Sequence, residues 1–178
     1  MMKKKVRSLD ERVSRIVAHW PAALHSFFAQ VTIAGTPGIT FAISGLLMCA
    51  GLLLRSTELF YFGMAAAATL AIGIVMKHSF RRRRPDTEYV TDMKLKSYSF
   101  PSGHSVGGAM IYGGFAWLAA SLIVAPFGQV VATLLVLFAG VIGVSRVYLG
   151  AHYASDVIAG WTLGALGVLI YAISIPLA

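Results

Sequence analysis

The sequence has few charged residues for its length. Asp, Glu, Lys and Arg make up 12% of 178 residues, whereas soluble domains carry about 25%. Between Gly103 and Ala178 only Arg146 and Asp156 are charged. With 57% hydrophobic residues, the chain has more apolar side chain than a soluble core of this size can bury. A soluble globular enzyme and a disordered tail are therefore excluded, and an integral membrane protein is expected.

Cysteine is nearly absent, since Cys49 is the single one. This excludes an intramolecular disulfide framework and a cysteine-built zinc site. Acidic residues are also scarce, with 7 against 15 basic ones and a net charge of +8. Such a balance can indicate nucleic-acid binding, but the basic run Arg81–Arg84 directly follows an apolar segment. The lipid bilayer, and not nucleic acid, is the expected partner of this chain.

Five apolar runs are long enough to cross a bilayer, which takes about 20 helical residues. Small residues at close spacing, such as Gly160 and Gly164, allow membrane helices to approach closely. We therefore expect an all-α integral membrane fold, a compact bundle of five to six transmembrane helices. The five runs cover Gly38–Leu54, Leu59–Met76, Gly103 to Ala125-Pro126, Phe127–Val144 and Tyr153–Ile175.

The N-terminal part leaves the number of spans open. Residues 1–15 hold six basic residues, and Ile16–Ala34 is apolar but interrupted by histidine, proline and glutamine. No cleavage pattern of a signal peptide follows. Ile16–Ala34 is expected to be an interfacial helix in preference to a sixth span. The expected organisation is a basic N-terminal segment over 1–35 and a helix bundle over 36–178, in a single domain.

Ionisable residues at the edges of membrane spans are costly and by default mark a functional site. The first group of them is Lys77 with Arg84 and Pro85. If the second span continues past Lys77, the separation of seven residues is two helical turns, and Lys77 and Arg84 share a face. Pro85 disfavours helix at Arg84.

Two further groups lie at other span ends. Pro101-Ser102-Gly103-His104 has the form of a helix N-terminus, with a capping serine and a glycine. Such a terminus attracts anions through its free N–H groups and dipole. Ser145-Arg146 is followed by His152 and Asp156, which are i,i+4 neighbours. An aspartate behind a histidine fixes its tautomer and leaves the other ring nitrogen free to react.

Together these groups supply what phosphoryl transfer requires. Three cations and a helix N-terminus can neutralise one anion, while two histidines and a carboxylate supply a nucleophile, a proton donor and an orienting group. Catalysis of this reaction is mainly positioning and charge neutralisation. The planar fork of arginine fits phosphoryl oxygens.

The three groups resemble the three signature blocks of the type 2 phosphatidic acid phosphatase superfamily, over about residues 36–178. The resemblance implies a lipid phosphatase without metal or cofactor that forms a phosphohistidine intermediate. His152 would be the nucleophile, Asp156 its orienting partner, and His104 the group that protonates the leaving oxygen and then activates water. The resemblance assigns the phosphoryl oxygens to Lys77, Arg84, Ser102, the Gly103 N–H and Arg146.

The expected substrate is a membrane lipid phosphate or diphosphate, because a site at span ends lets the lipid tails stay in the bilayer. Phosphatidic acid, phosphatidylglycerophosphate, polyprenyl diphosphate and lipid A phosphates remain open, as does the oligomeric state. A catalytically silent lipid-phosphate binder would predict loss of His104 or His152, and both are present. Five membrane spans count against a vanadate-dependent haloperoxidase of the same fold.

The face of the membrane depends on the N-terminal segment. If Ile16–Ala34 spans, seven basic residues lie opposite the site against five beside it, with Lys77, Arg84 and Arg146 set aside. The positive-inside rule then places the site outside. If it does not span, the count is eleven beside the site against one opposite, which favours the cytoplasm. The resemblance alone favours the extracytoplasmic face of a bacterial inner membrane.

Overall fold

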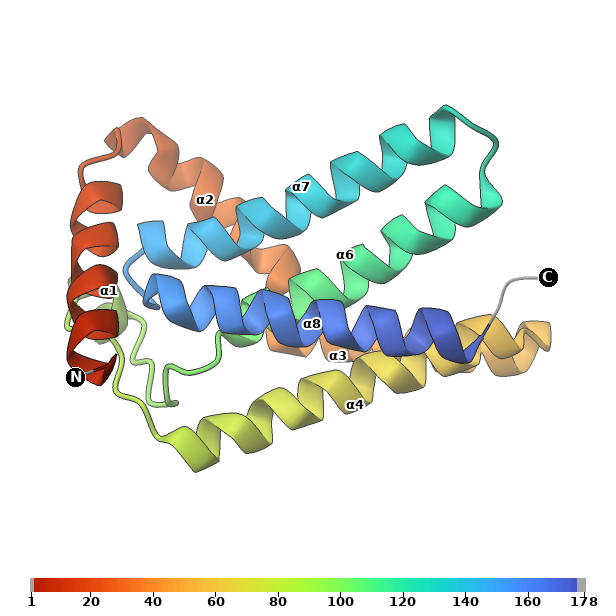
Figure 1. Cartoon of the computed structure of the whole chain (residues 1–178), viewed down its shortest axis with the longest axis horizontal. Coiled ribbons are helices and arrows are strands. Elements are labelled where there is room, and N and C mark those ends of the chain that lie inside the picture. The colour runs from red at the N-terminus through yellow and green to blue at the C-terminus, as the bar shows by residue number, and fades with distance from the viewer. Residues whose placement is uncertain (1, 176–178) are drawn as a thin grey trace.

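The computed structural model describes residues 2–175, and the regular elements in this range are all helices. The five longest helices lie side by side along the length of the molecule (Figure 1). The α-helices are α1 (Met2–Ala18), α2 (His25–Val31), α3 (Pro37–Leu54), α4 (Thr57–Phe80), α5 (Glu88–Asp92), α6 (Gly103–Leu122), α7 (Phe127–Tyr148) and α8 (Ala154–Ser174), with 3₁₀ turns at Ala22–Leu24 and Thr32–Gly35.

Five segments of the described chain are long and apolar enough to cross a membrane. They are Ala22–Leu54, which joins α2 and α3 through the 3₁₀ turns, and the helices α4, α6, α7 and α8. The expected all-α integral membrane bundle is confirmed. The helix bounds differ from the apolar runs by a few residues, because polar end residues such as Lys77 and Arg146 still belong to α4 and α7.

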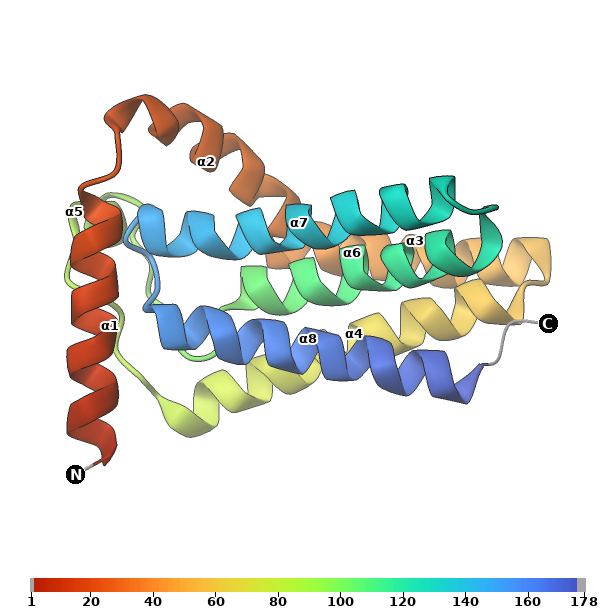
Figure 2. The same ribbon diagram turned by 45° about the horizontal axis from the view of Figure 1, so that its top comes forward.

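The N-terminal region differs from the single helix expected over Ile16–Ala34. Residues 16–18 form the last turn of α1, and residues 22–34 belong to the start of the first span. The break falls at Pro21, which lacks an N–H and disfavours helix at the residue before it. Helix α1 runs across the ends of the long helices instead of along them (Figures 1 and 2).

Glycines set the close contact between α8 and α6. A Cβ added to Gly160 would lie 2.7 Å from the Cβ of Ser105, and one added to Gly164 would lie 2.6 Å from the Cβ of Ala109. These small residues let two membrane helices approach closely, as expected from their spacing. Next to this contact, the N–H of Ser102 at the start of α6 donates to the carbonyl of Asp156 in the first turn of α8 over 3.0 Å.

The helix ends that carry the three polar groups lie at one end of the bundle. The C-termini of α4 and α7 and the N-termini of α6 and α8 meet there, beside α1 and α5 (Figure 2). The turns from α3 to α4 and from α6 to α7 lie at the opposite end. The up-and-down order of the spans therefore collects residues from four helices at one membrane level.

Candidate active site

The end of α4 differs from the sequence expectation. Arg81 adopts a left-handed conformation with φ 48° and caps the helix, its N–H donating to the carbonyl of Lys77 over 3.0 Å. The helix thus ends at Phe80, so Lys77 and Arg84 do not share a helical face. A left-handed C-cap residue satisfies the last carbonyls and turns the chain. Arg84 reaches the same region from the segment after the helix.

His152 and Asp156 form the buried centre of the site. His152 is 2% exposed and Asp156 is fully buried. The Nδ1 of His152 lies 3.5 Å from Oδ2 of Asp156, which also accepts a 3.0 Å hydrogen bond from the N–H of Tyr153. Burial lowers the pKa of His152 to about 3, although the hydrogen bond to Asp156 acts in the opposite direction. The imidazole is therefore neutral at physiological pH.

Arg84 contacts the other ring nitrogen of His152, Nε2. Its NH1 group donates to Nε2 of His152 over 2.9 Å and to the carbonyl of Ala151 over 2.8 Å. Its Nε and NH2 groups donate to the carbonyl and hydroxyl of Ser97. Burial, followed by the positive charge of Arg146, lowers the pKa of Arg84. Since a guanidinium only donates, Nε2 of His152 carries the lone pair and Nδ1 carries the proton.

Lys77 lies beside the N-terminus of α6. Its Nζ donates to the carbonyls of Tyr98 and Pro101 over 3.0 and 2.7 Å. A Cβ placed on Gly103 would lie 3.9 Å from Cε of Lys77. Ser102 is buried and caps α6, its hydroxyl accepting from the N–H of Ser105 over 3.4 Å. The helix N-terminus expected at these residues is confirmed, and an ammonium group lies next to it.

Arg146 is a buried cation with a free donor. It is 3% exposed, and its NH1 group donates to the hydroxyl of Thr32 over 2.7 Å. The guanidinium carbon lies 5.7 Å from the centre of the Tyr89 ring. Its Nε is buried without a hydrogen-bond partner among the residues that the structure describes. A buried, unpartnered N–H on a charged group is available to an anion.

His104 lies within electrostatic range of residues from the other two groups. It lies in the first turn of α6, where the charges of Arg146, Lys77 and Arg84 and the ring of His152 all act on it electrostatically. The structure therefore brings together the residues that the sequence analysis selected from four segments of the chain. Two imidazoles, one carboxylate and three cations at one end of a membrane bundle can bind a phosphoryl group, attack it and supply a proton.

Ser99 is a site residue that the sequence analysis missed. It is fully buried, and its hydroxyl donates to Oδ2 of Asp156. The hydroxyl oxygen of Ser99 also lies 3.4 Å from Nδ1 of His152. Its own N–H donates to the carbonyl of Arg82 over 2.8 Å. A lone serine in a polar segment carries no sequence signal for such a position.

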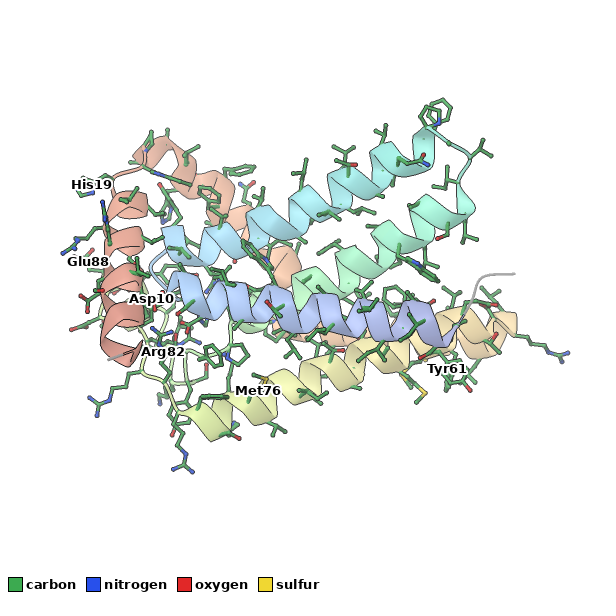
Figure 3. The ribbon with its side chains drawn as sticks, viewed as in Figure 1. Asp10, His19, Tyr61, Met76, Arg82 and Glu88 are labelled. Atoms are coloured by element: carbon green, nitrogen blue, oxygen red, sulfur yellow. The ribbon has the colours of Figure 1, made fainter. Side chains whose placement is uncertain are left out.

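Arg82, in the basic run Arg81–Arg84, is a second residue of the site that the sequence analysis did not select. Its side chain is 27% exposed and donates to Oδ1 of Asp156 over 2.7 Å and to Oδ2 of Asp10 over 2.6 Å. Figure 3 shows Asp10 and Arg82 close together where α1 passes the start of α8. Arg81 and Arg83 are exposed. One arginine of the run is therefore built into the site.

Comparison with known proteins gives a consistent result. The sequence profile of the PAP2 superfamily matches residues 58–177. Phosphatidylglycerophosphatase B of Bacillus subtilis is 38% identical over 96 residues, which are 52% of this chain and 45% of that protein. Undecaprenyl-diphosphatase of Sulfolobus acidocaldarius is 33% identical over 100 residues, 54% of this chain and 45% of that protein. The matched segments span less than half the length of both curated relatives.

Two solved structures share the fold. A transmembrane PAP2 type phosphatidylglycerolphosphate phosphatase from Bacillus subtilis superposes with a TM-score of 0.81 at 24% identity, covering 96% of this chain and 86% of that chain. LpxE of Aquifex aeolicus superposes with a TM-score of 0.67 at 19% identity, covering 93% of this chain and 95% of that chain. The agreement over almost the whole chain includes the N-terminal region that precedes the profile match.

Proposed function

The chain belongs to the PAP2 superfamily, and on that premise we propose that it is a metal-independent phosphatase of a membrane lipid phosphate or diphosphate. The observation that carries the proposal is the orientation of His152. Its Nδ1 faces Asp156 at 3.5 Å, its Nε2 carries the lone pair, and a guanidinium lies 2.9 Å from that nitrogen. A buried neutral imidazole with its reactive nitrogen beside a cation is prepared to attack phosphorus.

The proposed reaction has two steps. In the first, Nε2 of His152 forms a bond to phosphorus, the bond from phosphorus to the lipid oxygen breaks, and protonated His104 gives its proton to that oxygen. In the second, His104 takes a proton from water, the resulting hydroxide attacks phosphorus, and the bond to His152 breaks. Asp156 stabilises the imidazolium of the phosphohistidine. The proposed holders of the phosphoryl oxygens are Lys77, Arg84, Ser102, the Gly103 N–H and Arg146.

The substrate class follows from the position of the site. A lipid whose tails lie along the bundle brings its phosphate to the helix ends where the cations meet. An apolar groove of about 460 Å³ runs between α6, α7 and α8, lined by residues that include Ala109, Gly140, Trp161 and Val168. Ala109 and Trp161 each follow a proposed catalytic residue by five positions, about 7.5 Å along a helix. We propose that one lipid tail occupies this groove.

The names of the curated relatives narrow the headgroup. One relative is named for phosphatidylglycerophosphate and the other for undecaprenyl diphosphate. Both substrates are amphiphiles with a terminal phosphate, and we propose the same class for this chain. A catalytically silent lipid-phosphate binder is the second candidate, but it gives no reason for a complete pair of histidines with a carboxylate behind one of them.

We further propose that the site faces the cytoplasm of a bacterial cell. Helix α1 lies at the same end of the bundle as the site (Figure 2), and the first span begins only at Ala22. Eleven basic residues outside the proposed catalytic set then lie at the site end, against Arg55 at the other. Basic residues beside membrane spans favour the cytoplasmic side. The proposal replaces the extracytoplasmic face that the resemblance alone favoured.

The test of the activity is phosphate release by the purified full chain in detergent, with EDTA present. The panel holds phosphatidic acid, phosphatidylglycerophosphate, a polyprenyl diphosphate and a lipid A phosphate, with the His152→Ala variant measured in parallel. Release by the parent and none by the variant supports a metal-independent lipid phosphatase. Retained release by His152→Ala would exclude the phosphohistidine mechanism. Binding of these lipids without release by the parent would favour the silent binder.

A further inference from the structure

The N-terminal helix α1 carries a buried carboxylate. Asp10 is 3% exposed, and Asp10 and Asp156 are the two buried acidic side chains among those the structure describes. The Oδ1 atom of Asp10 accepts from the N–H of Ser155 over 2.9 Å, and its Oδ2 atom accepts from the hydroxyl of Ser155 over 2.7 Å. This carboxylate therefore binds the first turn of α8, next to Asp156.

Arg82 joins the two buried carboxylates. One nitrogen, NH2, donates to Asp10 over 2.6 Å, and the other, NH1, donates to Asp156 over 2.7 Å and to the hydroxyl of Ser155 over 2.6 Å. The guanidinium lies over the ring of Tyr153, its central carbon 4.3 Å from the ring centre. A planar fork held at both ends and on one face has little freedom to move.

Arg82 acts on Asp156 by a second route. Its carbonyl accepts the N–H of Ser99, whose hydroxyl donates to the Oδ2 atom of Asp156. The oxygens of Asp156 are thus held from two sides, Oδ1 by the guanidinium and Oδ2 by the serine and the Tyr153 N–H. Movement of Arg82 would release both sides together.

From this arrangement we propose that Asp10 is a positioning residue that acts through Arg82 on Asp156 and so on the reactivity of His152. The inference rests on the proposed phosphatase function and extends the reaction site to a helix outside the profile match at residues 58–177. Asp10 shares the positive charge of Arg82. Arg82 then compensates less of the negative charge of Asp156. More of that negative charge stabilises the imidazolium that forms as His152 is phosphorylated.

A second consequence concerns geometry. Helix α1 packs on the bundle through Val17, which lies with Val147 and Val157 in one buried cluster. Asp10 lies on the same face as Val17, seven residues or two turns away. The apolar contact and the carboxylate together fix α1 across the site end of the bundle. Because Asp10 holds Arg82 and Ser155 there, α1 keeps the start of α8 in the conformation that aims Asp156 at His152.

The test uses the Asp10→Asn variant of the full chain in detergent, labelled with ¹⁵N-histidine. Asparagine keeps the shape of the side chain and removes the negative charge that pairs with Arg82. We expect kcat to fall about ten- to a hundredfold, as for loss of an outer partner that orients a functional histidine, with KM unchanged. The ring nitrogen signals of His152, identified by their loss in His152→Gln, should shift. Asp92→Asn, the same change at an exposed position of the site end, should change neither.

A second variant covers the case in which Asp10→Asn does not fold. Arg82→Lys keeps the charge, but one ammonium cannot bridge both carboxylates in the planar geometry. The same fall in kcat with an unchanged KM is expected. In the Arg82→Lys background, Asp10→Asn should add little, because coupled residues are not additive. Independent, multiplying losses would overturn the proposed route through Arg82.

The outcomes separate this inference from the proposed function. A parent protein without phosphatase activity would overturn the function, while the shift of the His152 signals in Asp10→Asn would still report the coupling. Parent-like kcat and parent-like His152 signals in a folded Asp10→Asn protein would overturn the inference and leave the phosphatase function intact. A loss confined to KM would place Asp10 in substrate binding and also overturn it.

Discussion

Arg84 donates a hydrogen bond to Nε2 of His152 over 2.9 Å, so a guanidinium covers the nitrogen proposed to attack phosphorus. This contact fixes the tautomer of the free protein, because Nε2 must accept and Nδ1 then holds the proton. An incoming phosphoryl group offers Arg84 three anionic oxygens in place of one nitrogen. In the proposed mechanism, transfer of Arg84 to those oxygens would uncover the nucleophile as the phosphate arrives and so couple binding to activation.

The first prediction concerns the protonation of His152. Its pKa lies near 3 because burial disfavours the imidazolium, against about 6.5 for an exposed histidine. The neutral, nucleophilic form should therefore persist throughout pH 5–8. The measurement is a ¹⁵N titration of the histidine-labelled protein, with His152→Gln to identify the signal. The His152 nitrogens should not move in this range, and a midpoint between pH 5.5 and 7 would contradict the prediction.

The second prediction concerns Ser99. The Ser99→Ala variant loses a hydrogen bond to the carboxylate of Asp156, a type worth about 1.5–3 kcal/mol. We expect kcat to fall about ten- to a hundredfold, since each 1.36 kcal/mol is tenfold in rate, with the fold retained. The control is Ser121→Ala on the exposed part of α6, whose hydroxyl donates to the carbonyl of Trp117 in the same helix. Equal rates for both variants would remove Ser99 from the site.

The spans and the charged residues that the sequence analysis assigned to the candidate site were predictable from the sequence for a physical reason. A chain in a bilayer must satisfy its backbone within helices, so long apolar runs have one outcome. The cost of charge in such a chain marks Lys77, Arg84, Arg146 and Asp156 without any knowledge of the fold. Their convergence then follows from the alternating direction of the spans.

The network around Asp156 was not predictable in the same way. Asp10 and Arg82 are 72 residues apart, and Ser99 is 57 residues from Asp156. No periodicity relates such positions, because the segments that carry them are loops or a helix outside the bundle. The left-handed conformation of Arg81 has no sequence signal either, and it decides that Arg82 turns inward while its neighbours remain exposed. Around Pro21 the sequence pattern shows an interruption, but it does not fix where α1 ends and the first span begins.

The third prediction concerns the face of the membrane. In a Cys49→Ala background, Asp92→Cys places a thiol at the site end and Val124→Cys places one at the turn between α6 and α7. Both positions are exposed. If the site is cytoplasmic, a membrane-impermeant maleimide should label Val124→Cys in spheroplasts, and Asp92→Cys only after permeabilisation. The reverse pattern would place the site outside the cell and contradict the charge count.

The last prediction concerns the apolar groove. A Cβ on Gly140 meets nothing within 4 Å, so Gly140→Leu should fold while filling part of the groove between α6, α7 and α8. A tail displaced from the groove finds equally apolar surroundings in the bilayer, so the loss is in alignment and not in hydrophobic energy. Misplacement of the phosphate by about 1 Å can cost about a hundredfold in rate.

We therefore expect Gly140→Leu to lower kcat/KM about ten- to a hundredfold for long-chain lipid phosphates and to leave a short-chain, water-soluble phosphate ester unaffected. The matched control is Gly45→Leu, which also meets open space, on α3, outside the groove. Phosphate release from substrates of increasing chain length, measured for both variants, separates the two positions. A parallel fall at every chain length would indicate a disturbed bundle, and no fall at any length would exclude the groove as the site of the lipid tail.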